Sequence, residues 1–114
     1  MVRTVHIGVL HLVLRISGAR TLKDRRQVVR SLRDRVRHRF DVTWHEVEPS
    51  DSPARCGVVC TTGGNDSRLI RSILDRVHRF VEQSGHAWPE TVDLDVFPWH
   101  PPDGPWHMEE TTDG

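Results

Sequence analysis

The segment that most constrains the fold runs from Val5 to Ile16 and reads VHIGVLHLVLRI. Its residues are mostly β-branched or leucine, and Gly8 is the one residue that typically interrupts regular structure. Successive side chains of a strand point to opposite faces, so the apolar residues of this segment fall on both faces. Strands with two apolar faces are typical of the middle of a sheet. The sequence therefore predicts a long central strand that is covered on both sides.

Two amphipathic helices are predicted. The first covers about 22–39, because Thr21 followed by Asp24 has the form of a capping box and apolar residues then recur at helical spacing. The second starts after the possible N-cap residues 65–67 and carries an apolar stripe at i, i+3, i+4 and i+7. It ends at the Ser-Gly pair 84–85. Both helices have one face to bury.

Three further segments are predicted to be strands, at 41–48, 55–62 and 92–96. The order of elements is then β-α-β-β-α-β, which predicts a ferredoxin-like α+β sandwich. In this fold two right-handed crossovers form a four-stranded antiparallel sheet with both helices on one face. We expect one domain over residues 1–97 and a flexible acidic tail, rich in Pro, Trp and His, over 98–114.

The predicted sandwich leaves one face of its sheet uncovered, although the segment Val5–Ile16 is apolar on both faces. A second copy of the chain is the simplest cover for this face. We therefore expect a homodimer, or a larger homo-oligomer, held through the sheet face away from the helices.

Composition excludes several classes of protein. Hydrophobic residues make up 36% of the chain and charged residues 28%, and there are two cysteines, which excludes collagen-like, wholly disordered and disulfide-rich chains. The apolar run near residues 9–14 is far shorter than the ~20 residues of a membrane helix. The first residues lack the features of a signal peptide. We expect a cytoplasmic protein without a membrane partner.

The sequences HIGVL at 6–10 and ISGARTLKDRRQVV at 16–29 resemble the opening of the YlxP-like family, domain of unknown function 503 (DUF503). Members of this family start with a Gly-Val-Leu strand, a Gly-Ala-Arg-Ser-Leu-Lys turn and a basic helix. The similarity runs from about Val5 to Phe97 and is most specific over 18–26. It implies the same ferredoxin-like fold, and the family's gene neighbours point to translation or ribosome maturation. No activity is established for the family.

The net charge of zero conceals a strong asymmetry along the chain. Segment 20–39 has nine Lys or Arg residues against Asp24 and Asp34, a net charge of +7, whereas segment 80–114 has eight acids and no Lys or Arg. Arginine keeps its charge at any physiological pH, and its planar fork fits phosphate. We expect the following residues to bind nucleic acid or another anion: Arg20, Lys23, Arg26, Arg30, Arg33 and Arg37.

The favoured function is a small cytoplasmic binding protein that is associated with RNA or the ribosome through its first helix. A first alternative is that the basic helix is a solvated face, partly neutralised by the acidic half of the chain. A second is a small dimeric enzyme or ligand-binding accessory protein, for example of a biosynthetic pathway, with a pocket on the open sheet face. That pocket would be lined by some of the following residues: His6, His11, Trp44, His45 and Glu46.

The candidate site residues show no established catalytic or metal-binding pattern, and we expect no cofactor and no metal. By strand parity His6 and His11 point to opposite faces, as do His45 and Glu46. Cys56 and Cys60 are about 13 Å apart on a strand, too far for a disulfide or a shared metal, so we expect them to be small core residues.

The turn at residues 17–20 precedes a capped helix N-terminus. Its exposed N–H groups, together with Arg20 or Lys23, are one possible anion site. We favour the simpler interpretation, which is a tight turn that needs the permissive backbone of Gly18.

Overall fold

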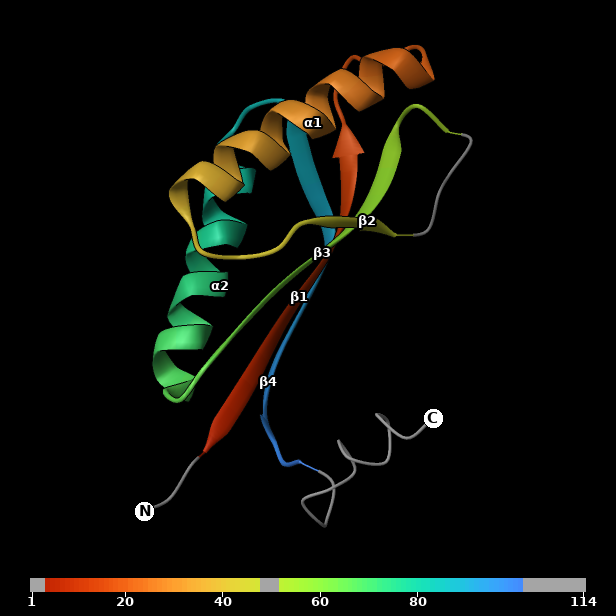
Figure 1. Cartoon of the computed structure of the whole chain (residues 1–114). Helices are drawn as coiled ribbons and strands as arrows, with labels where there is room; N and C mark the ends of the chain where they lie inside the picture. Colours follow the sequence, from red (N-terminus) through yellow and green to blue (C-terminus); the bar gives the residue numbers. More distant parts are fainter. Residues whose placement is uncertain (1–3, 48–51, 102–114) are drawn as a thin grey trace, which may run out of the picture.

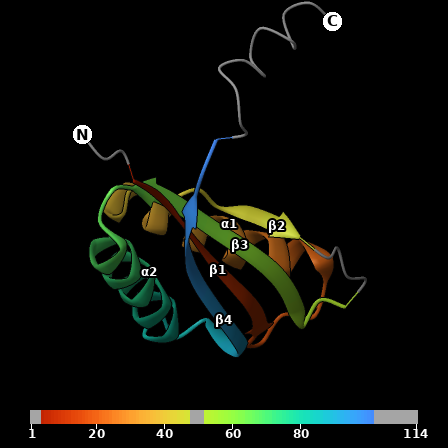
Figure 2. The same ribbon diagram turned by 90° about the horizontal axis from the view of Figure 1, so that it is seen from below.

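The computed structural model describes residues 4–47 and 52–101 of the chain. The observed element order is the predicted one (Figure 1). The elements are β1 (Val5–Ile16), α1 (Leu22–Arg39), β2 (His45–Val47), β3 (Arg55–Gly64), α2 (Ser67–Glu82) and β4 (Ala87–Trp99). The strands form one antiparallel sheet in the order β2-β3-β1-β4, and both helices lie on the same side of it (Figure 2). This is a ferredoxin-like fold.

The core lies between the sheet and the two helices. Strand β1 is central and pairs with β3 and β4 along its length, so that Leu10 stands opposite Cys60 on one side and Leu94 on the other. From Gly8 to Ile16, every second residue of β1 faces the helices and is buried there. The fully buried side chains that form this core are Leu10, Leu12, Leu14, Val29, Leu32, Val36, Val58, Cys60, Leu74, Val77 and Val81.

Both helices begin at the residues that their capping patterns indicate. The Thr21 hydroxyl accepts a hydrogen bond from the backbone N–H of Asp24, and the Asp24 carboxylate accepts one from the backbone N–H of Thr21, which completes the capping box of α1. The Asp66 side chain accepts hydrogen bonds from the backbone N–H groups of Arg68 and Leu69 at the start of α2. The boundaries of α1 match the predicted ones.

Gly8 allows α2 to pack directly on β1. A Cβ atom placed on Gly8 would lie 2.4 Å from Cγ2 of Ile70 and 2.8 Å from Cδ1 of Leu74. Both distances are shorter than any van der Waals contact between carbon atoms. Gly8 therefore marks a close approach of helix and sheet, and it does not interrupt the strand.

Strand β2 begins at His45, later than the predicted 41–48, and residue 48 lies outside the described residues. The backbone N–H of Thr43 still donates to the carbonyl of Thr61 at 2.9 Å. The backbone N–H of Thr61, however, donates to the Thr43 hydroxyl instead of a β2 carbonyl. A side chain thus replaces one bond of the ladder, and regular pairing begins only at His45.

Strand β4 is longer than the predicted 92–96. It contains Pro89 and Pro98, which edge strands tolerate because one side of their backbone pairs with nothing. Its pairing register with β1 shifts between Val13 and Leu14. The strand runs to Trp99, two residues past the boundary expected at residue 97. Residues 102–114, where most of the expected tail falls, lie outside the described residues.

Candidate nucleic-acid interface

A row of arginines runs along one flank of α1. Arg26, Arg30 and Arg37 are exposed and Arg33 is half-buried. Their spacing of four, three and four residues places them on one side of a helix with 3.6 residues per turn. We call these four residues the arginine row. It lies away from α2, because the flank of α1 that faces α2 carries other arginines, whose guanidinium groups lie over the Phe80 ring of α2.

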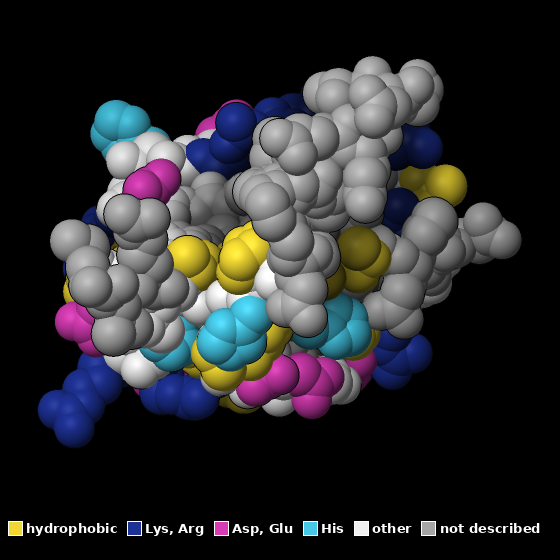
Figure 3. All heavy atoms as spheres, turned by 60° about the horizontal axis from the view of Figure 1, so that its bottom comes forward, with side chains coloured by type: hydrophobic (Ala, Val, Ile, Leu, Met, Phe, Trp, Pro, Cys, Tyr) yellow, Lys and Arg dark blue, Asp and Glu magenta, His cyan; other side chains and the backbone are white. Residues whose placement is uncertain are grey.

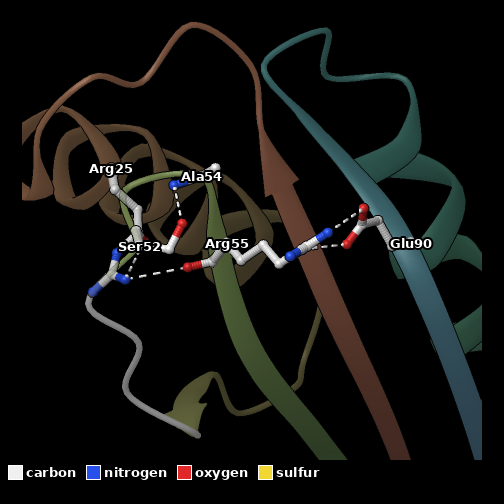
Figure 4. A network of polar contacts seen from close by, with 5 residues as sticks. All are labelled: Arg25, Ser52, Ala54, Arg55 and Glu90. Carbon is white, nitrogen blue, oxygen red and sulfur yellow. Dashed lines mark hydrogen bonds and ion pairs between the residues drawn. The ribbon is translucent and has the colours of Figure 1, made fainter.

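The acids of β4 do not neutralise this row. The carboxylate of Glu90 pairs with Arg55 of β3 at 2.8 Å, and that of Asp93 lies 3.4 Å from Nδ1 of His11 in β1 (Figure 4 shows the Glu90 pair). Among residues 4–47 and 52–101, no ion pair connects α1 with β4. Arg33 does pair with its neighbour Asp34 at 2.9 Å. Among the described residues, the arginine row of α1 therefore makes no ion pair with the acids of β4.

The N-terminus of α1 is already occupied by a carboxylate from its own first turn. One Asp24 oxygen accepts hydrogen bonds from the backbone N–H groups of Arg20 at 3.0 Å and Thr21 at 3.2 Å. These bonds, first the one from Arg20, lower the pKa of Asp24. Gly18 has φ of +76°, as the turn interpretation requires. The side chains of Arg20 and Lys23 are exposed beside this turn.

Arg25 has a structural role and is not part of the arginine row. Its side chain is buried, and its Nη1 donates hydrogen bonds to the backbone carbonyls of Ser52 at 2.9 Å and Arg55 at 3.2 Å (Figure 4). These bonds tie α1 to the beginning of β3. Within a run of basic residues, the sequence does not distinguish this buried arginine from its exposed neighbours.

Only some of the residues that were expected to line a pocket lie on the open face of the sheet. Residues His11 and His45 lie on this face, on either side of Val59 in adjacent strands. Trp44 belongs to the core instead, and Glu46 accepts a hydrogen bond from the thiol of core residue Cys56 at 3.7 Å. Of the residues named for the pocket, His11 and His45 therefore share the open face, whereas Trp44 and Glu46 do not, because alternate residues of a strand point to opposite sides.

His6 also lies on the helix side, since it alternates with the outward-facing Ile7 and stands opposite Gly64 and Pro98. Figure 3 shows a face on which hydrophobic, histidine and acidic side chains lie next to one another. Within the described ranges, no group of three or more His, Cys, Asp or Glu residues is placed to hold a metal ion.

Both cysteines are buried core residues, as predicted. They are free thiols on the helix side of β3. Burial, with a smaller contribution from the charge of Glu46, raises the pKa of Cys56 to about 11. Burial raises the pKa of Cys60 to about 12. Neither thiol is activated as a nucleophile, because reactive cysteines have lowered pKa values.

One arginine cluster was not identified from the sequence. Arg35 and Arg39 of α1 meet Arg76 and Arg79 of α2 around two phenylalanine rings. The two phenylalanines count as apolar positions at the ends of the two helical stripes, so their role as a platform for arginines becomes visible only when the helices lie side by side. A stripe that ends in an aromatic residue surrounded by arginines is the one sequence signal for such a cluster.

Fold and surface together define a small ferredoxin-like protein with a basic helical layer. The chain belongs to the family described as "Protein of unknown function (DUF503)", whose model matches residues 7–93. This match confirms the family resemblance noted at residues 6–10 and 16–29.

A solved structure similar to this chain is the solution NMR structure of a de novo designed protein, LFR1 1, with a ferredoxin fold. It is 11% identical in sequence, the alignment covers 92% of both chains, and the TM-score is 0.35. No curated protein matches the chain. In the part of the chain that the structure describes, neither helix is both long and apolar enough to cross a membrane.

Proposed function

We propose that this protein binds RNA, in the context of the ribosome or its assembly, through the arginine row of α1. The observation that carries the proposal is that Arg26, Arg30 and Arg37 are exposed on one flank with no ion-pair partner among the described residues. From the first to the last arginine the row spans about 16 Å at 1.5 Å per residue. That length is sufficient to contact several phosphates of a folded RNA.

The sheet favours structured RNA over single strands as the target. Sheets that bind single-stranded RNA stack bases on aromatic residues of their central strands. Here the open face of the two central strands carries no Phe, Tyr or Trp; its residues include His11 and the aliphatic side chains of Val9, Val13 and Val59. Contacts from α1 would therefore be made to phosphates and to the shape of the RNA, with little selection among bases.

We place this activity in the cytoplasm. Cys56 and Cys60 are both unbridged, and their spacing along one strand excludes a bridge between them. Free cysteines are typical of proteins kept in the reducing cytosol.

We also propose that the protein is a homodimer through the open sheet face. None of the described elements covers this face, and Ile7, Val9 and Val13 of β1 point toward it. Both helices lie on the opposite side. A second copy can cover these aliphatic side chains without hiding the arginine row.

The RNA proposal is tested by titrating the whole chain with a fluorescent RNA hairpin at several salt concentrations. We expect the logarithm of affinity to fall linearly with the logarithm of salt, with a slope of roughly −3 for three or four phosphate contacts. The pair Arg26→Glu and Arg30→Glu should weaken binding about tenfold or more. These two positions are preferable to Arg33, which pairs with Asp34.

The matched control is the pair Arg68→Glu and Arg71→Glu, two exposed arginines at the start of α2. This pair changes the total charge by the same amount, so a loss caused by charge alone would appear in both variants. The RNA proposal is wrong if the two pairs lose affinity equally. It is also wrong if the unmodified chain shows no binding at tens of micromolar in low salt.

A further inference from the structure

The C-terminal ends of the two helices enclose a second basic feature, distinct from the arginine row. The rings of Phe40, which follows α1, and Phe80 in α2 meet edge to face, with centroids 5.8 Å apart and an interplanar angle of 73°. Beside them is a hollow of about 260 Å³. It is lined by Arg39, Phe40, Arg76, Arg79, Phe80 and Gln83.

The phenylalanine rings hold three guanidinium groups in place. The guanidinium carbons of Arg35 and Arg39 lie 5.9 Å and 5.2 Å from the centroid of the Phe80 ring, and that of Arg76 lies 5.7 Å from the centroid of the Phe40 ring. Arginines of α1 thus lie over a ring of α2, and an arginine of α2 lies over the ring that follows α1. Stacking of this kind fixes a guanidinium without using its N–H donors.

The donors of these arginines have no carboxylate partner among the described residues. The ion pairs there are His11–Asp93, Arg33–Asp34 and Arg55–Glu90, and none of them involves the cluster. Arg79 Nε lies 3.5 Å from the carbonyl oxygen of Asp75 in its own helix. Apart from Nε of Arg79, which donates to that carbonyl, the N–H groups of this cluster are available to an acceptor from outside the chain.

The local charge remains strongly positive after the helix ends are counted. Each helix C-terminus is equivalent to about −0.5 of a charge, so the two ends offset roughly one of the four positive charges. The carboxylate of Asp34, which lines an adjacent hollow, is paired with Arg33. Several like charges held on rigid rings repel one another, and a multiply charged anion relieves that repulsion.

We propose that this hollow binds a diphosphate group, either as free pyrophosphate or as part of a nucleoside diphosphate. Guanidinium forks bind phosphate oxygens in bidentate fashion, and two linked phosphates supply enough oxygens and charge for several forks. The adjacent hollow, of about 600 Å³, shares Arg39 and Phe80 with the first and offers room for a nucleoside. The site uses no residue of the arginine row, so it does not depend on the RNA proposal.

Calorimetric titration of the whole chain tests this site, with pyrophosphate, ADP and orthophosphate as separate ligands. We expect pyrophosphate to bind at least tenfold more tightly than orthophosphate. The pair Arg39→Gln and Arg76→Gln should weaken pyrophosphate binding more than tenfold. Tighter binding of ADP than of pyrophosphate identifies a nucleoside diphosphate as the ligand, and equal or weaker binding of ADP identifies the diphosphate group alone.

Two control pairs make the result specific. The pair Arg68→Gln and Arg71→Gln removes the same charge from α2 away from the hollow and should leave pyrophosphate affinity within about twofold. The pair Arg26→Glu and Arg30→Glu, which tests RNA binding, should also leave it unchanged, so the two proposals fail or succeed separately. If the glutamine pair at 39 and 76 does not fold, the lysine pair Arg39→Lys and Arg76→Lys keeps the charge, removes the planar fork, and should still weaken binding several-fold.

Three results would overturn the proposal. The first is no pyrophosphate binding at millimolar concentration, and the second is equal affinity for orthophosphate and pyrophosphate. The third is an equal loss of affinity in the variants at Arg39 and Arg76 and in the control variants at Arg68 and Arg71.

Discussion

Arg25 and Arg26 are neighbours in the sequence and have opposite roles in the structure. Arg25 is buried and donates to the carbonyls of Ser52 and Arg55, whereas Arg26 extends into solvent. An α-helix turns by about 100° per residue, so adjacent side chains face different surroundings. Residue type alone therefore says little about the function of an arginine here, and burial together with hydrogen-bond partners separates structural arginines from binding ones.

The reactivity of the two cysteines also depends on their surroundings, which gives a testable prediction. Burial raises the pKa of Cys56 to about 11 and that of Cys60 to about 12. At pH 8 about one Cys56 thiol in a thousand is then ionised, and the thiolate is the reactive form. We expect neither thiol of the native protein to react with Ellman's reagent within minutes at pH 8.

In denaturant both thiols should react at once, since unfolding removes the burial that raises their pKa values. Rapid reaction of one thiol in the native protein would show that β3 opens to solvent or that the thiol is less buried than the structure indicates.

At the scale of elements, a few close contacts decide how the helices and strands pack against one another. Strand β1 contacts both neighbouring strands along its length, and α2 packs on it directly at Gly8. The α1–α2 contact brings together Phe40 and Phe80, which lie in separate apolar stripes of the sequence. The spacing of apolar residues within one element predicts which face of that element is buried. The contacts between elements decide which residues that face packs against.

The Gly8→Ala variant tests the contact between β1 and α2. A methyl group at this position would overlap Ile70 and Leu74, so helix and sheet must separate or repack. Overpacking of this kind costs about 1–3 kcal/mol of unfolding free energy. Urea denaturation followed by circular dichroism measures the change.

Gly64→Ala is the matched control for this variant. A Cβ atom at Gly64 would lie 3.8 Å from Cδ1 of Ile70, an ordinary contact with the same side chain that Gly8 faces. We expect a change of less than about 0.5 kcal/mol, as for most exposed positions. Equal destabilisation by the two variants would mean that overlap with α2 is not the cause, because losing the flexibility of glycine at an unstrained position does not itself destabilise the folded state.

At the scale of the whole molecule, the exposed arginines of the helices lie apart from the acids of β4 in the described part of the chain. The arginine row and the cluster around Phe80 belong to the helical layer, whereas Glu90 and Asp93 belong to β4. The open sheet face lies opposite the helices and carries the outward side chains of β1. The molecule therefore offers a cationic surface on its helices and a partly apolar sheet face, which two different partners can occupy at the same time.

Light scattering at micromolar concentration tests the proposed dimer. We expect a mass near twice the 13.1 kDa of one chain. Val9→Lys should lower that mass toward one chain, because it places a charge in the proposed interface. The monomer should tolerate this lysine, since Val9 stands opposite Asp95 of β4.

Ser72→Lys, which adds the same charge to an exposed position of α2, should leave the mass unchanged. A mass of 13.1 kDa for the unmodified chain would refute the dimer.

The sequence by itself determined the features that depend on a few consecutive residues. The capping box at Thr21 and the apolar spacing behind it predicted α1 with its observed bounds, and strand parity correctly separated His6 from His11. Periodicity, caps and turns are local, because backbone geometry sets the repeat of 3.6 residues in helices and of two in strands. The order of such elements was sufficient to predict the ferredoxin-like fold.

Only the tertiary structure decided the features that join distant residues. These are the burial of Arg25 against β3, the extension of β4 to Trp99 by pairing with β1, and the meeting of Phe40 with Phe80. Each depends on how elements pack in three dimensions, and packing depends on side chains that are far apart in the chain. The sequence shows that the first helix is basic, and the fold shows which of its arginines remain free to bind.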